Sequence, residues 1–342
     1  MARQRPLAPN YVRETPKRAG GGRNRGPLVE KAHAAIKQGS KSFHAASRLF
    51  SRTTRERVWL LYAWCRRCDD IADGQVMGGE LGDQSDIADR VKSIRVLTRR
   101  ALDGQPTGDP AFDAFGLVAS ECGLTMEDAE AVIAGFELDA QDWRPRDERD
   151  LMRYCWHVAG AVGVMMAKVM GVPRGDEGTL AEDTLDRAAD LGFAFQLANI
   201  ARDIAEDDAA DRCYLPVEWL VEEDIEPGQH MKPHHRQEMA DIAERLVSLM
   251  ELHAAASRIG AARLPFRSRW AILTAARIYT AIGHEVRRRG TEAWDHRVYT
   301  SKLQKIGHAL AAFFEALWHR PPALAELPRW TRRNLAEHVA TA

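Results

Sequence analysis

The sequence predicts an all-α fold, and three observations lead to that prediction. From about Val29 onward, apolar residues recur at helical spacing within stretches rich in Ala, Leu, Arg and Glu. Short clusters of Gly, Pro and Asp separate these stretches, as they commonly do between helices. No stretch alternates apolar and polar residues in the manner of a half-buried strand. We therefore expect a single-domain helical bundle with an apolar interior.

Each expected helix is bounded by turn-forming residues. In chain order, the expected helices cover residues 29–38, 42–50, 54–73, 85–102, 110–122, 125–140, 147–171, 179–205, 216–221, 234–260, 267–289 and 300–318. The breaks contain Gly, Pro or Asp and fall at residues 74–83, 103–110, 144–145, 171–178, 207–216 and 226–233. The most apolar stretch, residues 158–172, is short and contains Lys168, so no transmembrane helix is expected.

The charge balance and the cysteines limit the class of protein. The chain has 48 Lys and Arg against 49 Asp and Glu, so we expect no nucleic-acid partner. Its 5 cysteines are odd in number and scattered, which favours the reducing cytoplasm. Residues 1–28 are rich in Arg and Pro and predict a disordered basic arm. The helical domain is expected to cover residues 29–320, followed by a C-terminal tail, 321–342.

Three aspartates crowd the end of the expected helix over residues 54–73. Asp69 and Asp73 are four residues apart and share one helix face, with Asp70 beside them. Carboxylates this close repel each other unless cations lie among them, and Mg²⁺ takes oxygen ligands of this kind. The alternative is a solvated acidic helix end that Gly74 terminates. A second acidic segment decides between these two interpretations.

The second acidic segment lies in the expected helix over residues 179–205 and just beyond it. Asn199, Asp203 and Asp207 are spaced by four residues and form a polar stripe, with Gln196 one turn earlier. A helix end that emerges into solvent explains the acids near Asp207. It does not explain Gln196 and Asn199, which lie among apolar residues, because buried polar groups need partners. If the two acidic helices face each other across the bundle, they form a divalent-metal cage open to a diphosphate.

Three further segments fit a site for a ligand with phosphate groups and an apolar tail. Ser40 and Arg48 provide a small donor and a guanidinium for phosphate oxygens. Arg212 and Tyr214 follow the second acidic helix in a flap-like loop. Residues 154–163 contain several Gly and Ala, which make a flat surface for another helix or for a long apolar ligand.

Together these segments resemble the squalene/phytoene synthase family of head-to-head prenyl synthases. The matching pieces occur in family order and cover about residues 30–310. They are residues 39–43, 62–74, 154–163, 195–203 with Asp207, 212–216, 264–265 and 270–279. Residues 62–74 and 212–216 most resemble the phytoene-forming members. One departure is Asp211, where relatives often have glycine; it leaves the metal ligands intact.

The resemblance implies an all-α bundle of the isoprenoid (terpenoid) synthase type with a central apolar cavity. It implies Mg²⁺ (or Mn²⁺) held by Asp69, Asp70, Asp73, Asn199, Asp203 and Asp207. It implies substrate contacts from Ser40, Phe43, Arg48, Arg66, Val158, Gln196, Asn199, Arg202, Arg212, Tyr214 and Arg297. The aspartates are also expected to be catalytic, together with Tyr62 and Tyr154. These two tyrosines and the released diphosphate are the candidates for the base.

The reaction that the resemblance implies joins two molecules of geranylgeranyl diphosphate head to head. Prephytoene diphosphate is the intermediate, phytoene is the product, diphosphate is released, and NADPH is not expected. Because the substrate tails and the product are membrane-soluble, we expect a cytoplasmic protein associated peripherally with the inner face of the membrane. Contact with neighbouring carotenoid-pathway enzymes is a further expectation.

Two alternatives stay open at this stage. A sister enzyme would use the C15 substrate farnesyl diphosphate to make squalene or dehydrosqualene, and pocket depth separates C15 from C20 chains. The second alternative is a non-catalytic relative that binds lipid or another protein. Such a protein should have lost acidic ligands from one or both helices, whereas both sets are complete in this sequence.

Overall fold

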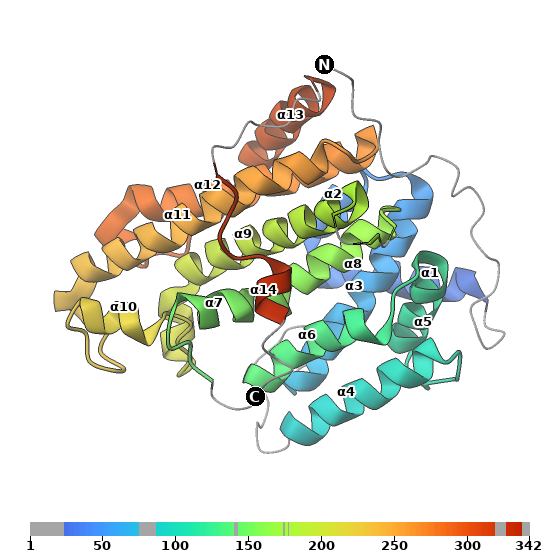
Figure 1. Ribbon diagram of the computed structural model, residues 1–342, viewed down its shortest axis with the longest axis horizontal. Helices are drawn as coiled ribbons and strands as arrows, with labels where there is room; N and C mark the ends of the chain where they lie inside the picture. The colour runs from blue at the N-terminus through green and yellow to red at the C-terminus, as the bar shows by residue number, and fades with distance from the viewer. Residues whose placement is uncertain are drawn as a thin grey trace. The chain divides into compact units, whose positions relative to one another are not determined.

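In the computed structural model, the residues described are 24–74, 87–139, 143–173, 175–176, 178–318 and 326–336. Their regular secondary structure is entirely helical, which confirms the predicted fold class (Figure 1). The chain forms two compact units, and the helices α8, α9 and α12 contribute residues to both. Most of the predicted basic arm and about half of the predicted C-terminal tail lie outside the described residues.

The first unit is built around α3. It contains α1 (Arg25–Gly39), α2 (Lys41–Ser47), α3 (Arg52–Ala72), α4 (Ile87–Leu102), α5 (Pro110–Cys122), α6 (Met126–Asp139) and most of α8 (Ala161–Val169). Trp64 of α3 is fully buried and stacks on Phe115 of α5, with 4.3 Å between ring centroids. Its Nε1 donates to Thr98 Oγ1 of α4 at 3.2 Å. This packing fixes the orientation of α3, whose C-terminal end carries the first acidic segment.

A buried ion network joins α1 to α3 and α5. The side chain of Glu121 is 0% exposed and accepts from Arg25 Nε at 2.8 Å and from Arg57 Nε at 2.7 Å. Arg25 also pairs with Glu56 of α3 at 2.5 Å. Because a buried charge is tolerated only when it is paired, this network explains why α1 begins at Arg25. The hydrophobic periodicity alone predicts a start at Val29.

The second unit is built mainly from α9, α11 and α12. It contains α7 (Glu148–Cys155), a π-helical turn (Trp156–Gly160), most of α9 (Leu180–Ala209), α10 (Val217–Glu222), α11 (Arg236–Ala261), most of α12 (Phe266–Arg289), α13 (Lys302–Trp318) and α14 (Arg332–Ala336). Short 3₁₀ turns lie at Pro233–His235 and Gly290–Glu292. In its core, Asp190 of α9 pairs with Arg187 at 2.9 Å and contacts His253 Nδ1 of α11 at 2.7 Å.

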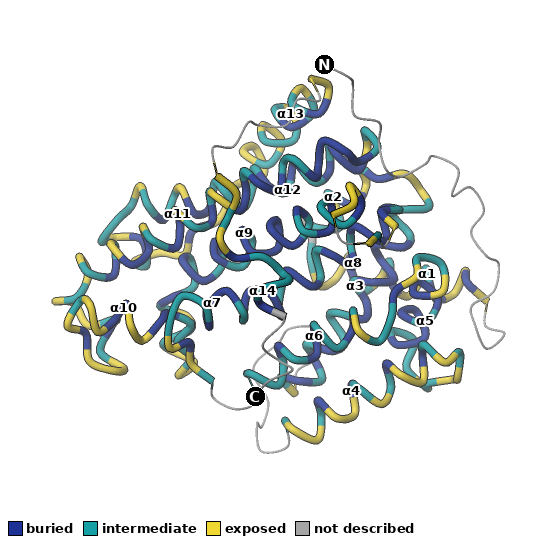
Figure 2. The backbone as a smooth tube through the Cα atoms, in the orientation of Figure 1, coloured by how far each residue is buried: buried dark blue, intermediate teal, exposed yellow. Residues whose placement is uncertain are grey.

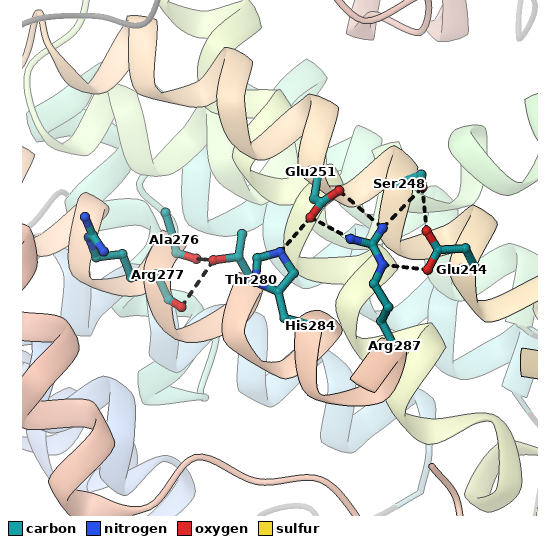
Figure 3. A network of polar contacts seen from close by, with 8 residues as sticks. All are labelled: Glu244, Ser248, Glu251, Ala276, Arg277, Thr280, His284 and Arg287. Carbon is teal, nitrogen blue, oxygen red and sulfur yellow. Dashed lines mark hydrogen bonds and ion pairs between the residues drawn. The ribbon is translucent and has the colours of Figure 1, made fainter. Parts of the chain in front are cut away.

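Ion pairs also join the exposed sides of α11 and α12 (Figure 3). Arg287 Nε donates to Glu244 Oε2 at 2.5 Å, and its Nη1 donates to Glu251 Oε1 at 2.8 Å. His284 Nε2 lies 2.7 Å from the same Glu251 oxygen. Burial raises the pKa of Glu251, but the hydrogen bonds from Arg287 and His284 outweigh burial and hold this pKa below its usual value.

Two further features differ from the helices that the sequence predicts. The expected continuous helix over residues 147–171 is interrupted by the π turn Trp156–Gly160, where Gly160 lies against α9. A Cβ atom on Gly160 would lie 2.8 Å from Phe193 Cε1, so only glycine fits there. The short α14 is not among the predicted helices, although Leu335 is buried within it. None of the helices in the described ranges is long and apolar enough to cross a membrane.

Candidate active site

The first acidic segment lies at the C-terminal end of α3. This helix begins after Ser51, whose side chain accepts from Thr54 N, and ends at Ala72, followed by the C-cap Asp73 and by Gly74 with φ +65°. Asp69 and Asp70 therefore lie in the last helical turn, which contains no basic residue. Carboxylates there interact unfavourably with the negative end of the helix dipole. Helix stability does not explain this placement, and such local conflicts are expected at functional sites.

Arg66 compensates two of these carboxylates. Its Nη1 donates to Asp69 Oδ2 at 2.9 Å, and its Nη2 lies 3.2 Å from Asp70 Oδ1. The side chain of Asp70 is 5% exposed, whereas that of Asp69 is 43% exposed. Asp70 and Arg66 also line a pocket of about 220 Å³ together with Arg67 and Asp109. The buried Arg66 Nε has no hydrogen-bond partner in the described part of the chain.

Among the candidate residues near the start of the first unit, Phe43 contacts Tyr62. Ser40 caps α2 by accepting from Phe43 N at 3.3 Å. The Phe43 ring meets the edge of Tyr62 with 5.7 Å between centroids. Burial raises the pKa of the Tyr62 phenol, so Tyr62 is neutral at neutral pH. Arg48 ends α2 and is exposed.

The predicted polar stripe on α9 is present. Gln196, Asn199, Asp203 and Asp207 are all half-buried. The neighbouring apolar residues Leu197, Ala198, Ile200, Ala201 and Ile204 are buried, and Figure 2 shows α9 as a mostly buried helix. The stripe follows one helix face because its members are three or four residues apart. The apolar residues on the other faces hold α9 in the second unit, so these four polar side chains are presented on a rigid element.

Two arginines hold the Asp203 carboxylate. Arg202 donates from Nε to Asp203 Oδ1 at 2.7 Å and also contacts the other carboxylate oxygen through Nη2. Arg297, which follows α12, places Nη2 2.8 Å from Asp203 Oδ1. Arg297 also lines an open, mainly polar pocket of about 1090 Å³. The structure thus brings Arg297 to the second acidic segment, far from it in sequence.

The chain turns sharply where α9 ends. Arg212 N donates to the carbonyl of Asp207 at 2.8 Å, and Asp211 N donates to that of Asp208 at 3.0 Å. This bonding pattern is a Schellman motif, which needs a left-handed residue after the helix. Asp211 is that residue, with φ +57°. Glycine adopts this conformation at the least cost, which gives a physical reason why glycine suits this position.

Tyr154 and Tyr214 lie together in the second unit. Their rings stack with 4.6 Å between centroids, and Trp143 also stacks with Tyr154 at 5.8 Å. Val158 lies in the π turn and is half-buried. The small residues of this segment pack against α9: a Cβ on Gly163 would lie 2.4 Å from the Ala188 carbonyl oxygen. Helix packing therefore accounts for Gly163.

Tyr279 of α12 is a site candidate that the sequence analysis missed. Its ring stacks on Phe195 of α9 with 4.0 Å between centroids. Burial raises the pKa of its phenol, and the charges of Arg202 and Asp203 also act on it. The residue lies within a segment that resembles the family, but nothing in the local sequence connects it to α9.

The donor set fits a hard divalent cation. Carboxylates and the amide oxygen of Asn199 are ligands that Mg²⁺ accepts. Within the described ranges, no three His, Cys, Asp or Glu side chains are positioned to hold a metal ion. Arginine instead compensates the two best-defined carboxylates, Asp70 and Asp203. Asp69, Asp70 and Asp73 belong to the first unit and the α9 residues to the second.

Solved structures define the class of protein to which this fold belongs. A dehydrosqualene synthase in complex with a ligand has a TM-score of 0.74 at 23% sequence identity, over 86% of this chain and 98% of its own. The squalene synthase HpnC from Alicyclobacillus acidocaldarius has a TM-score of 0.68 at 22% identity, over 77% of this chain and 94% of its own. The fold is therefore the all-α isoprenoid synthase fold, as predicted.

Sequence comparisons define the family. The squalene/phytoene synthase family model matches residues 36–304. The phytoene synthase of Pseudescherichia vulneris is 44% identical over 288 residues, which cover 84% of this chain and 91% of its own. The 15-cis-phytoene synthase of Pantoea ananas is 41% identical over 315 residues, which cover 90% of this chain and 99% of its own. The chain therefore belongs to the squalene/phytoene synthase family, whose members are prenyl-transferring enzymes.

Proposed function

We propose that this chain catalyses the reaction of a 15-cis-phytoene synthase. Two molecules of geranylgeranyl diphosphate condense head to head to prephytoene diphosphate and then to phytoene, with release of diphosphate. The observation that carries the proposal is the identity of 41–44% to bacterial phytoene synthases over most of both chains. The site supports it, because carboxylates on helices lie beside arginines in both units.

The carboxylates and Asn199 are proposed to hold Mg²⁺ (or Mn²⁺). The proposed ligands are Asp69, Asp70 and Asp73 on α3 and Asn199, Asp203 and Asp207 on α9. When bound, the metal neutralises the negative charge of a departing diphosphate. The acidic segments are suited to this role because their carboxylates now pair with arginines. Those arginines can pair with phosphate oxygens instead.

The arginines are proposed to bind the diphosphate groups. Arg66, Arg202 and Arg297 already lie beside the acidic residues. Arg48 and Arg212 are assigned the same role, and Ser40 and Tyr214 are proposed to donate hydrogen bonds. A guanidinium suits this task because it binds phosphate oxygens through two parallel N–H groups.

Aromatic and apolar side chains are proposed to protect the reacting carbon atoms. Loss of diphosphate leaves an allylic carbocation, which the C2–C3 double bond of the second substrate attacks; loss of a proton then closes the cyclopropane. A second ionisation, rearrangement and proton loss give phytoene. The rings of Phe43 and Tyr62 offer negative π-faces to such cations. Val158 and Gln196 are proposed to contact the substrate, and Tyr62, Tyr154 and diphosphate stay the candidates for the base.

The second candidate function is a squalene-type synthase that uses C15 substrates. The structural likeness to a dehydrosqualene synthase at 23% identity supports the fold but not this substrate. One experiment separates the two functions: the purified chain is incubated with Mg²⁺ and either geranylgeranyl or farnesyl diphosphate, with and without NADPH. We expect a C40 product from the C20 substrate, independent of NADPH. Product from the C15 substrate alone would reject the proposal.

The proposed location follows from the chemistry of the substrates and product. Geranylgeranyl tails and a C40 hydrocarbon dissolve in lipid rather than in water. We therefore propose a cytoplasmic protein that contacts the inner face of the membrane peripherally and exchanges these compounds with neighbouring enzymes of the carotenoid pathway.

A further inference from the structure

The helix α13 presents most of its large apolar side chains to solvent. Leu303, Ile306, Leu310, Phe314, Leu317 and Trp318 are each more than half exposed, as Figure 2 shows for the exposed stretches of this helix. Their spacing of three and four residues places most of them along one helix face. A continuous exposed apolar surface of this kind marks a docking site rather than an ordinary solvated face.

The opposite face of α13 packs against its own unit with small and charged residues. Ala312 and Ala316 are fully buried. Glu315 accepts from Arg258 Nε of α11 at 3.1 Å and from Arg277 Nε of α12 at 2.8 Å. A surface helix normally buries its Leu and Phe and exposes its charges. In α13 a row of Leu, Ile and Phe side chains is exposed and Glu315 is turned inward, where two ion pairs to separate helices hold it.

Charge and aromatic content identify the kind of partner. Glu315 is the only acid of α13 and is turned inward, whereas Lys302 is exposed at the start of the helix. Trp318 ends the helix, and Tyr299, which is 79% exposed, shortly precedes it. Aromatic residues of this kind favour the boundary between lipid and water. An acid-free apolar face with Lys302 at one end and exposed aromatic residues at both ends fits an anionic lipid surface.

We propose that α13 docks the protein on an anionic lipid bilayer, with its apolar row entering the headgroup and acyl boundary. The helix is about 25 Å long and lies flat on the membrane. This inference rests on the proposed function for its purpose, because a bilayer stores the C20 substrates and accepts the C40 product. The family match ends at residue 304, so nearly all of this row lies beyond it.

The test measures flotation of the full-length protein with vesicles of phosphatidylcholine containing about one third phosphatidylglycerol. The α13 variant carries Leu310→Glu and Phe314→Glu. The matched control carries Val96→Glu and Val221→Glu, at positions that are 55% and 65% exposed on α4 and α10. We expect the wild type and the control to float. We expect the α13 variant to bind at least about tenfold more weakly, because two charges oppose insertion.

Two further measurements distinguish apolar insertion from electrostatic attraction, and failure of the docking proposal from misfolding of the variant. Binding that persists at about 0.5 M salt, where the Debye length is only a few Å, reports apolar insertion rather than attraction of the basic N-terminal residues. Turnover with detergent-dispersed substrate should be the same in the α13 variant and the wild type, which shows that the variant folds. Absence of product from the wild type would reject the proposed function without affecting the flotation result.

Three outcomes would overturn the docking proposal. The first is equal flotation of the α13 variant and the wild type. The second is a wild type that does not float. The third is a wild-type dimer in light scattering that the α13 variant abolishes while vesicle binding is absent, because a second copy of the chain would then cover this face.

Discussion

Arg297 pairs with Asp203 at 2.8 Å and so joins the segment after α12 to the acidic stripe of α9. Arg202 holds the same carboxylate, but the two arginines differ in exposure: the side chain of Arg202 is 16% exposed and that of Arg297 is 53% exposed. The more exposed guanidinium reorients at lower cost. We therefore expect Arg297, rather than Arg202, to move from Asp203 to a substrate phosphate.

Arg297→Ala should lower kcat/KM for the prenyl diphosphate by about tenfold, because one charge-assisted hydrogen bond is lost. Arg297→Lys should recover part of the loss, since it restores the charge but not the two parallel N–H groups. Arg288→Ala is the control, as Arg288 pairs with Glu285 on the same helix at 2.6 Å. Steady-state kinetics check the three variants. Equal losses in Arg297→Ala and Arg288→Ala would show that Arg297 has no special role.

Asp70→Asn should reduce turnover by about 10²-fold or more, because charge stabilisation at the reacting group is lost. The free energy of unfolding should change little, since Arg66 keeps Asp69 as a partner. The control is Asp109→Asn on the same pocket wall; Asp109 pairs with Arg67 at 2.7 Å and caps α5. Its turnover should stay near that of the wild type. An Asp70→Asn enzyme that is fully active with Mg²⁺ would refute the metal assignment.

Asp211→Gly should stabilise the protein by about 0.5–1 kcal/mol, because glycine adopts a positive φ without the steric cost of a Cβ. Asp211→Ala should destabilise it by a similar amount. Asp224, with φ +53°, is the second non-glycine residue with positive φ in the described ranges and should respond in the same way. Urea denaturation of the four variants measures the effect. A lower unfolding midpoint for Asp211→Gly would contradict this account.

Glu251→Gln should lower stability at pH 7 by a few tenths to about 1 kcal/mol, as for an exposed ion pair. The folded-state pKa of Glu251 lies below its usual 4.5. Its stabilisation is therefore fully present above about pH 4.5 and is lost as the pH falls through the folded-state pKa. Thermal unfolding of the wild type and the variant should converge once the pH has fallen below the folded-state pKa of Glu251.

The exposed Glu226→Gln is the matched control for this measurement, because no ion pair of Glu226 is among those of the described residues. It should unfold like the wild type at every pH. A constant difference between the wild type and Glu251→Gln across the whole pH range would exclude titration of Glu251 as the cause.

Helix bounds were predictable where the sequence has strong local signals. The helix over residues 110–122 is predicted correctly, because Asp109 caps it, Pro110 begins it and Gly123 ends it with φ +68°. The π turn was not predictable, since hydrophobic periodicity does not report one additional residue in a helical turn. The short α14 was missed because its stability comes from contacts such as Arg332 with Asp186 at 2.6 Å, far away in sequence.

The candidate site was predictable in its residue types and spacing. Four-residue spacing alone places Asn199, Asp203 and Asp207 on one face, because helix geometry fixes that relation. It cannot give the contact of Arg297 with Asp203 or the stack of Tyr279 on Phe195, since tertiary packing brings those residues together. The metal and substrate roles of the site residues stay predictions that the variants above test.

The π turn Trp156–Gly160 has a consequence for changes in chain length. A π turn accommodates one residue more than the α-helical turn that it replaces. Deleting one residue there would restore a regular α-helix and leave the rotational register of both flanks in place. Tyr154 would still face Tyr214, and Gly163 would still meet Ala188. This segment is thus the point at which the helix should lose a residue without a change in the register of either flank.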